Sequence, residues 1–323
     1  MRPLKFHPIL KQTLWGGERI IPYKEPAAEV ARVGESWELS GMPGSESVVA
    51  EGPWTGSTLP ELIGRFGAEL LGKANYARFG QEFPLMVKFI DAREDLSIQV
   101  HPDDELARKR HGKSGKCEMW YVLEAEPGAS LLTGFSRPIA PAEYERRVAD
   151  NTLTDVLNRQ AIASGDVFYL PAGRVHSIGK GSFIVEIQQS SDITYRIYDF
   201  DRRDAAGNSR ELHTELAREA IDFESSENSR ITYAPENNQE VRLVTTPYFT
   251  TSLYTLTART RCDWSATDSF VAIVLLQGSG SLTDNEGNRI DVRQGETWLL
   301  PASTQWTEIT PHTAPLRLLT SRI

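Results

Sequence analysis

The sequence predicts a mainly β protein built from two antiparallel, jelly-roll-like β-barrel modules with a small helical insertion. Short runs of β-branched and aromatic residues, bounded by Gly, Pro, Asn and Asp, recur along the chain and are typical of strands. In addition, GDVFYLPAGRVHSI at 165–178 and GETWLLPASTQWTEI at 295–309 follow one pattern. In both, a Gly-acidic turn precedes an apolar strand, a Leu-Pro-Ala corner and a second strand. This arrangement suits the short, evenly spaced strands of barrels and jelly rolls.

Strands are the most frequent elements, and helical patterns are confined to three places. Residues 57–72 begin with Ser-Thr as possible N-caps, place a Pro in the first turn and continue with apolar residues at helical spacing. The same spacing recurs over 141–160 and from about 211 to 221. The clearest strands are expected at 85–90, 119–123, 167–170, 183–188 and 270–276.

The charge balance argues against a nucleic-acid-binding protein. The 323 residues include 35 Lys plus Arg against 44 Asp plus Glu, and the formal net charge of -9 has the wrong sign for neutralising a polyanion. An acidic protein that binds a small anion must therefore use a few placed basic groups. No stretch is apolar enough to span a membrane, and the N-terminus lacks the apolar run of a signal peptide. We expect a soluble, cytoplasmic protein without nucleic-acid or membrane partners.

The two cysteines, Cys117 and Cys262, are far apart and form no C-x-x-C arrangement. Neither a disulfide framework nor a cysteine-rich zinc site is therefore available, and a reducing compartment fits. Any bound metal would have to use His, carboxylate or amide ligands.

Four residues of the first module could bind one divalent metal ion. Gln99 and His101 are two apart, so on a strand their side chains point to the same face. Glu118 directly precedes a strong strand, and His176 follows the corner of the first repeat. Two nitrogen and two oxygen ligands from neighbouring strands suit a divalent metal, with further coordination positions open to water or substrate.

Each of these residues also has an ordinary interpretation. A single His is more often a surface or hydrogen-bonded residue than a ligand, and we keep that interpretation for His7, His111, His213 and His312. Glu118 could be a strand-end carboxylate that reaches solvent, and Gln99 could bond the backbone. A carboxylate directly before the apolar run MWYVL would be costly without a partner, which favours the metal.

Several pieces of sequence carry a resemblance to a known family. They are GESWELSG at 34–41, SIQVHP at 97–102, KCE at 116–118 before MWYVL, LPAGRVHSIG at 170–179 and QQSSDITYRIYDFDR at 188–202. With them the chain resembles the type I mannose-6-phosphate isomerases in their short bacterial form, which belong to the cupin superfamily.

The resemblance implies cupin-type barrels and one zinc ion (Zn2+) per chain. Its ligands would be Gln99, His101, Glu118 and His176. The implied activity belongs to carbohydrate metabolism: an aldose-ketose isomerase interconverts mannose 6-phosphate and fructose 6-phosphate through an enediol or enediolate. A small sugar phosphate is therefore the expected partner.

The resemblance also points to catalytic residues. Lys116 lies two residues before Glu118, so on a strand it faces the same side, where a neighbouring cation would disfavour its ammonium form and make it a proton carrier. Arg196 matches the family's active-site Arg and would hold the enediolate or substrate oxygens, because its charge is permanent. Asp192 matches an acidic position four residues earlier and would orient or relay. The ordinary alternatives are a solvated Lys and a surface ion pair, and the base that removes the proton from carbon stays open.

The phosphate of the substrate needs its own donors. Ser97 and Arg174 are candidates for substrate binding because they lie beside ligand positions in the sequence. Cys117 lies between Lys116 and Glu118 and points to the opposite face of an extended strand, so we leave it out of the ligand set.

Two other functions stay open. A metal-dependent cupin dioxygenase would hold iron and consume oxygen, and a non-catalytic cupin would bind a sugar phosphate without turnover. The combination of Lys116 with Arg196 favours the isomerase, because oxygenation does not call for this pair.

The repeat indicates that only the first module keeps the site. Trp306 takes the place of His176 in the second copy. Alignment of the apolar strands of the two copies places Phe270 where the first copy has Glu118. The second module therefore lacks two of the candidate ligands.

We accordingly predict a catalytic, metal-binding barrel over residues 1–239 and a second barrel over residues 240–323 without the metal site. The helical segments near 57–72 and 141–160 are assigned to the first of these domains. The role of the second barrel and the oligomeric state are not decided by the sequence.

Overall fold

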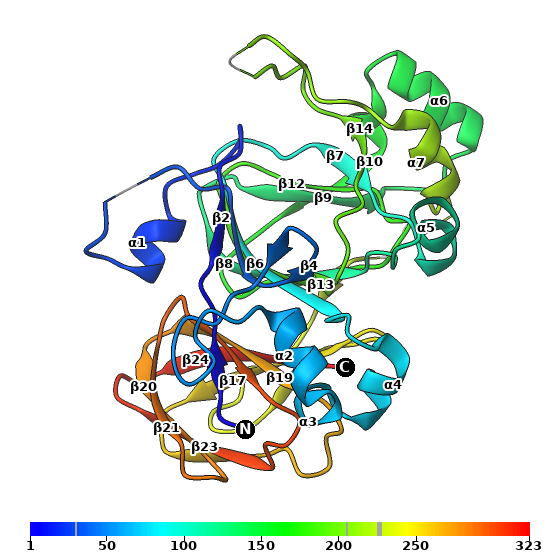
Figure 1. The fold of residues 1–323 in the computed structure, drawn as a ribbon. Helices are drawn as coiled ribbons and strands as arrows, with labels where there is room; N and C mark the ends of the chain where they lie inside the picture. Colours follow the sequence, from blue (N-terminus) through cyan, green and yellow to red (C-terminus); the bar gives the residue numbers. More distant parts are fainter. Residues whose placement is uncertain (30, 205, 225–227) are drawn as a thin grey trace.

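The computed structural model describes residues 1–29, 31–204, 206–224 and 228–323, which form two β-barrels stacked on each other (Figure 1). The strand ladders that build both barrels are antiparallel, including β13 with β6 and β8, and β24 with β17 and β19. The prediction of a mainly β protein with two jelly-roll-like modules is therefore confirmed.

The first barrel packs a seven-stranded sheet against a five-stranded sheet. In spatial order the seven strands are β15 (Arg230–Ile231), β11 (Val167–Leu170), β8 (Glu118–Ala125), β13 (Ser182–Gln189), β6 (Leu85–Ala92), β3 (Glu35–Leu39) and β2 (Ile9–Lys11). The five are β10 (Leu157–Ala161), β9 (Ser130–Phe135), β12 (His176–Ile178), β7 (Ile98–Val100) and β14 (Tyr195–Tyr198). A small ladder of β4 (Gly41–Met42) and β5 (Ser45–Glu46) lies beside them.

The second barrel combines a six-stranded sheet with a four-stranded sheet. The six strands are β1 (Leu4–Lys5), β22 (Thr297–Leu300), β19 (Val271–Gln277), β24 (Leu316–Arg322), β17 (Thr250–Leu256) and β16 (Val241–Thr245). The four are β18 (Thr260–Asp263), β23 (Trp306–Pro311), β20 (Ser279–Asp284) and β21 (Arg289–Arg293). Because Leu4 pairs with Leu299, the first strand of the chain completes the sheet of the second barrel.

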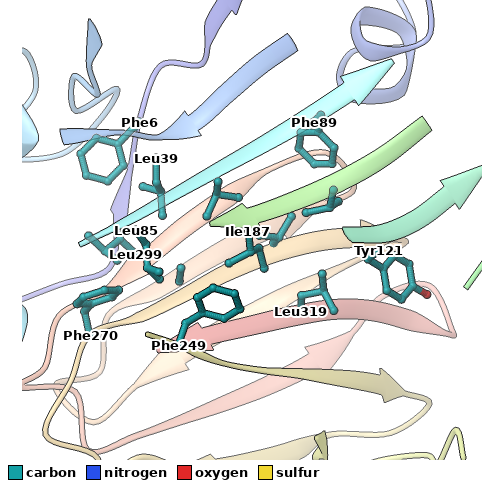
Figure 2. Close-up of a cluster of buried hydrophobic side chains, with 14 of the residues drawn as sticks. Phe6, Leu39, Leu85, Phe89, Tyr121, Ile187, Phe249, Phe270, Leu299 and Leu319 are labelled. Atoms are coloured by element: carbon teal, nitrogen blue, oxygen red, sulfur yellow. The ribbon is translucent and has the colours of Figure 1, made fainter. Parts of the chain in front are cut away.

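One apolar core joins the two barrels. Side chains alternate along β8, so Tyr121 points away from the first barrel while Trp120 and Val122 point into it. Figure 2 shows the shared core, in which Leu85, Phe89, Tyr121 and Ile187 of the seven-stranded sheet face the second barrel. The second barrel contributes Leu299 and Leu319 of the six-stranded sheet, and Phe249 and Phe270, which directly precede β17 and β19. Burial of apolar area stabilises a fold by roughly 25 cal/mol per Å², so this shared core stabilises the folded state of both barrels.

The helical segment predicted at 57–72 forms two short helices, α2 (Leu59–Phe66) and α3 (Ala68–Leu71), and a third helix that was not predicted, α4 (Lys73–Phe79), follows directly. Thr58 and Glu61 form a capping box at the start of α2, as the sequence indicated. The segment is interrupted at Gly72, whose φ is +94° and whose missing Cβ lets the carbonyl of Asp268 approach closely.

These helices lie against the second barrel. The carboxylate of Asp268 accepts hydrogen bonds from the first two backbone N–H groups of α4, at 2.7 and 2.9 Å. The N–H of Ala302 also donates to the carbonyl of Leu70 at 2.9 Å. The segment thus connects the early part of the chain to the C-terminal strands (Figure 1).

The helix predicted at 141–160 is wrong in its second half. Helix α6 (Pro141–Ala149) ends before Asn151, which has a positive φ of 55°, and a 3-10 turn, η1 (Leu153–Val156), leads into strand β10. The apolar side chains of Leu153, Val156 and Leu157 are all buried, so the turn and the strand bury the residues whose spacing suggested a helix. Pairing of β10 with β9 therefore overrides the helical period.

The third predicted helix is confirmed as α7 (Thr214–Ala220), whereas α1 (Ile20–Lys24) and α5 (Asp104–His111) are additional. Helix α5 has few apolar residues, but Asp103 caps it and its last turn is basic, which suits the helix dipole. Helices α5, α6 and α7 cover the outer face of the five-stranded sheet. Within the described chain, no helix combines the length and apolar character needed to cross a membrane.

Candidate metal centre

Four of the sequence-predicted residues converge inside the first barrel. Strands β7 and β12 pair with Gln99 directly opposite His176, so these side chains share one face of the five-stranded sheet. His101 directly follows β7, and Glu118 begins β8 in the opposing sheet. One ligand atom each from His101, Glu118 and His176 lie within 4.8 Å of one another, and all three residues are buried. It is the only group of His, Cys, Asp and Glu of this kind among the residues that the structure describes.

The backbone orients both imidazoles. Nδ1 of His101 lies 2.8 Å from the carbonyl oxygen of Ile193, and Nδ1 of His176 lies 2.8 Å from that of Arg174. Because a carbonyl only accepts hydrogen bonds, each Nδ1 carries the proton. Each neutral ring therefore presents the lone pair of Nε2 to the centre of the cluster, which is the arrangement that second-shell carbonyls impose on metal-binding histidines.

The electrostatics keep both rings neutral. Burial, together with the neighbouring charge of Lys116, lowers the pKa of His101 to about 3. Burial also lowers the pKa of His176. Neither ring needs to lose a proton at neutral pH before it can coordinate a cation.

Glu118 lacks a conventional hydrogen-bonding partner. It is fully buried, and neither carboxylate oxygen makes a well-aligned hydrogen bond with the described residues. Nε2 of His176 lies 3.2 Å from Oε1, and Nε2 of His101 lies 3.5 Å from Oε2. Two lone pairs thus face a carboxylate at short range, which is repulsive unless a cation lies among them.

Lys116 provides a positive charge at this point. Its Nζ lies 2.9 Å from Oε2 of Glu118 and 3.2 Å from Nε2 of His101. Burial alone would raise the pKa of Glu118, but the charge of the neighbouring Lys116 holds it well below its usual value. The carboxylate is therefore ionised and available to a metal ion.

Arg196 lies beside Gln99 on the same face of the sheet. Strands β14 and β7 pair with Arg196 opposite Gln99. The half-buried guanidinium donates from Nη1 to the carbonyl of Glu211 at 3.0 Å, and its buried Nε has no partner in the described chain. Burial and the nearby Arg210 lower its pKa from the ordinary value of an arginine. A permanently charged donor thus lies one strand away from the candidate ligands.

The other sequence-predicted residues lie further from the cluster. Asp192 is exposed and its carboxylate lies 2.8 Å from Nζ of Lys113. Ser97 is buried and donates to Oε1 of Gln99 over 3.4 Å. Arg174 contributes its carbonyl to His176, while its Nη1 donates to Ser229 at 3.0 Å. The guanidinium of Arg174 is thus bound to the segment before β15.

A buried ion pair in the seven-stranded sheet of this barrel was not predicted from the sequence. Nζ of Lys88 lies 2.9 Å from Oε2 of Glu186, and Nε1 of Trp120 donates to Oε1 of Glu186 at 3.1 Å. The Trp120 ring meets that of His176 edge-on, with centroids 5.4 Å apart. Charged residues at interior positions of two apolar strands were the available signal, because such charges are costly unless they are paired.

The second barrel has an apolar interior at the corresponding place. Trp306 begins β23 as His176 begins β12, and it stacks with the guanidinium of Arg261 at 4.2 Å. Phe270 is completely buried in the shared core. The interior of the second barrel is filled by large apolar side chains such as Tyr254, Trp264 and Trp298.

Comparisons with known proteins identify the relatives of this chain. The family model of the type I phosphomannose isomerase catalytic domain matches residues 4–132. A probable mannose-6-phosphate isomerase of Bacillus subtilis (strain 168) is 34% identical over 303 residues, which cover 93% of this chain and 93% of that protein. A mannose-6-phosphate isomerase of Streptococcus mutans is 33% identical over 303 residues, or 93% of this chain and 92% of that protein.

The fold is also that of a solved relative. The crystal structure of the mannose 6-phosphate isomerase from Bacillus subtilis matches with a TM-score of 0.89 and 29% sequence identity over 100% of both chains. Both barrels are included in this match. Because sequence similarity extends over nearly the whole chain, the chain belongs to the type I phosphomannose isomerase family and is an isomerase enzyme.

Proposed function

We propose that this enzyme is a zinc-dependent aldose-ketose isomerase that interconverts mannose 6-phosphate and fructose 6-phosphate through an enediol or enediolate. The observation that carries the proposal is the buried carboxylate of Glu118, faced by two oriented imidazole lone pairs and by Lys116. The relatives named as mannose-6-phosphate isomerases support the choice of substrate. The expected cytoplasmic location stays a prediction.

The donor set fits one zinc ion. His101 and His176 offer neutral nitrogens, Glu118 offers an anionic oxygen, and all three are held by a rigid barrel wall. Gln99 would supply its amide oxygen, which in this structure accepts the hydrogen bond from Ser97. When bound, the zinc ion would act as a Lewis acid that stabilises negative charge on a substrate oxygen.

The remaining groups would hold the substrate and move protons. Lys116 can donate a proton to a sugar oxygen and recover it, because its Nζ lies at the centre of the cluster and Glu118 balances its charge. Arg196 keeps its charge and would bind a developing oxyanion beside Gln99. The burial of these groups strengthens their interactions with substrate, because little water competes for them.

We propose supporting roles for two residues near the ligands. Asp192 binds Lys113 immediately before Ile193, whose carbonyl orients His101, so Asp192 would position a ligand. Arg174 orients His176 through its carbonyl while its side chain is bound to Ser229. Ser97 stays a candidate for substrate binding, because it lies next to Gln99 on the same face.

The test uses one protein sample for metal analysis and for a coupled assay of fructose 6-phosphate formation. The sample should contain one zinc ion per chain, lose activity with a chelator and regain it with added zinc. Full turnover of mannose 6-phosphate by the metal-free protein would contradict the zinc proposal. Oxygen consumption by an iron-containing sample without isomerisation would instead support the dioxygenase alternative.

A further inference from the structure

Asp199 binds two arginines at the end of β14. The residue is 5% exposed, and its Oδ1 lies 2.6 Å from Nη2 of Arg202 and 2.5 Å from Nη2 of Arg210. Nε of Arg210 donates to Oδ2 at 2.8 Å, so this pair is bidentate. Such paired hydrogen bonds fix the plane and direction of a guanidinium.

The backbone brings Arg210 next to Arg196. After Asp199 the chain turns sharply through Phe200 and Asp201, whose positive φ angles of 56° and 53° are unusual for residues other than glycine. It then returns alongside β14, where the N–H of residue 213 donates to the carbonyl of Arg196 at 2.7 Å. Nη1 of Arg196 donates to the carbonyl of the residue that follows Arg210. This excursion lies at the end of β14 in Figure 1.

Arg196 and Asp199 lie beside the strand that carries the candidate metal ligand Gln99. Arg196 is opposite Gln99, and after a bulge the next residue pair is Tyr198 opposite Ile98. Asp199 therefore lies near Ser97, which is on the same face of β7 as Gln99. Nη1 of Arg202 bonds the carbonyl of Asp95 at 2.5 Å and fixes the group to the start of this strand.

The local charge favours an anion. The guanidiniums of Arg196, Arg202 and Arg210 lie near the buried carboxylate of Asp199, and the exposed carboxylate of Glu211 also lies near Arg196, so basic groups outnumber acidic ones here in a chain whose net charge is -9. Most donors of Arg202 are used by the protein. Nη1 of Arg210 and Nη2 of Arg196 bond no other described residue, and the Arg210 side chain is 31% exposed. These donors are available to a ligand.

We infer that Arg210 binds the phosphate group of the sugar phosphate and that Asp199 is a positioning residue that orients Arg210 for this contact. The inference rests on the proposed function. A hexose 6-phosphate carries its reacting carbons and its phosphate at opposite ends, and the site has the same order: metal ligands, then Arg196, then Arg210. A guanidinium oriented in advance by Asp199 loses little entropy when it binds a phosphate.

The test compares Arg210→Met, Arg210→Lys and Asp199→Asn with the unchanged enzyme. We expect KM for mannose 6-phosphate to rise about 10- to 100-fold in Arg210→Met while kcat changes little, because a charge-assisted hydrogen bond to the non-reacting end is lost. The inhibition constant of inorganic phosphate should rise in parallel. Arg210→Lys should recover part of the affinity, and Asp199→Asn should show a smaller rise.

Arg203→Met is the matched control. Arg203 lies in the same excursion, and among the described residues its side chain bonds only the carbonyl of Gly207, so loss of this side chain should leave KM and phosphate inhibition unchanged. Unchanged KM and phosphate inhibition in Arg210→Met would overturn the inference, as would a fall in kcat alone. If Asp199→Asn does not fold, Arg210→Met and Arg210→Lys still test whether Arg210 binds the phosphate.

The outcome can be separated from that of the proposed function. If the unchanged protein does not isomerise mannose 6-phosphate, the proposed function fails. Calorimetric titration with inorganic phosphate then still tests Arg210. Weaker phosphate binding by Arg210→Met supports the phosphate site, and equal binding by both proteins overturns it.

Discussion

The two barrels share a fold but differ in what fills them. The interior of the first contains Gln99, His101, Glu118 and His176 together with the buried charges of Lys116, Lys88 and Glu186, whereas large apolar side chains fill the second. At the strand starts that correspond to His176 and Glu118, the second barrel has Trp306 and Phe270. Neither residue lies in the interior of the second barrel, because Trp306 is partly exposed and Phe270 belongs to the shared core. One barrel thus holds a polar cluster, and the other holds a solid apolar core.

This difference indicates a division of roles between the barrels. A buried polar cluster costs free energy unless it is fully paired, so the first barrel carries groups that do not favour its own folding. The second barrel offers an apolar sheet that covers the outer face of the first barrel. The shared core of Figure 2 would then offset part of that cost.

Loss of one ligand should have the largest effect. Glu118→Gln removes the anionic ligand, so we expect loss of bound zinc and a fall in kcat/KM of at least about 100-fold, because even supporting residues of metal ligands contribute 10- to 100-fold. Elemental analysis and the coupled assay measure both quantities. In the other barrel, Trp306→His should bind no additional metal, since no carboxylate lies at the place of Phe270. Full metal content and activity in Glu118→Gln would refute the assignment.

Lys116 separates proton transfer from metal binding. In Lys116→Met we expect kcat to fall by roughly 10²- to 10⁴-fold, the usual contribution of a positioned acid or base. The zinc content should stay at one per chain, because the imidazoles and Glu118 remain. The exposed Lys109, changed to Met, serves as a control and should keep its activity. Normal kcat in Lys116→Met would exclude Lys116 as the proton carrier.

The shared core predicts that the barrels unfold together. Phe270 is fully buried and its ring lies 4.8 Å from that of Phe83, so Phe270→Ala should lower the free energy of unfolding by about 3–5 kcal/mol. Chemical denaturation followed by fluorescence and by activity should give one coincident transition, with kcat of the folded enzyme unchanged. If activity survives a first transition, the barrels are independent units.

The smallest effect concerns the contact of β1 with the second barrel. Burial alone would raise the pKa of Glu296, but Lys5 and Nε1 of Trp298 keep this pKa below its ordinary value of 4.5. A lowered folded-state pKa contributes stability above the unfolded-state pKa, and that stability is lost as the pH falls through the folded-state value. Glu296→Gln should therefore lower the free energy of unfolding by about 1 kcal/mol at neutral pH and by less in acid.

Urea denaturation at several pH values measures this difference. Glu308, which forms a surface ion pair with Arg259, supplies the control Glu308→Gln with a smaller change. A difference for Glu296→Gln that does not shrink on acidification would show that its ionisation does not stabilise the contact.

Much of the fold could be predicted because strand signals are local. The five clearest strands lie within β6, β8, β11, β13 and β19 or overlap them. The helix expected at 141–160 failed in its second half because β10 found a pairing partner in β9, which no local period reveals. Helix α5 was missed because its stability comes from capping and dipole interactions more than from an apolar face.

The site could be predicted in part. Residues on strands followed the two-residue period, so Gln99 and Arg196 face the interior side by side. Arg174 lies in a turn, where that period does not hold, and its side chain is bound to Ser229. The pair Lys88 and Glu186 escaped because each residue is unremarkable until two distant strands meet.

By itself, the sequence determined the barrel repeat, the types of ligand and the absence of the site in the second copy, because these depend on residue identity and short-range spacing. Only the tertiary structure decided that β1 and helices α2 to α4 join the second barrel, and that Arg210 lies beside Arg196. These contacts join residues that are distant in sequence or separated by a turn. Their partners are selected by strand pairing and core packing over the whole chain, and no local pattern encodes that selection.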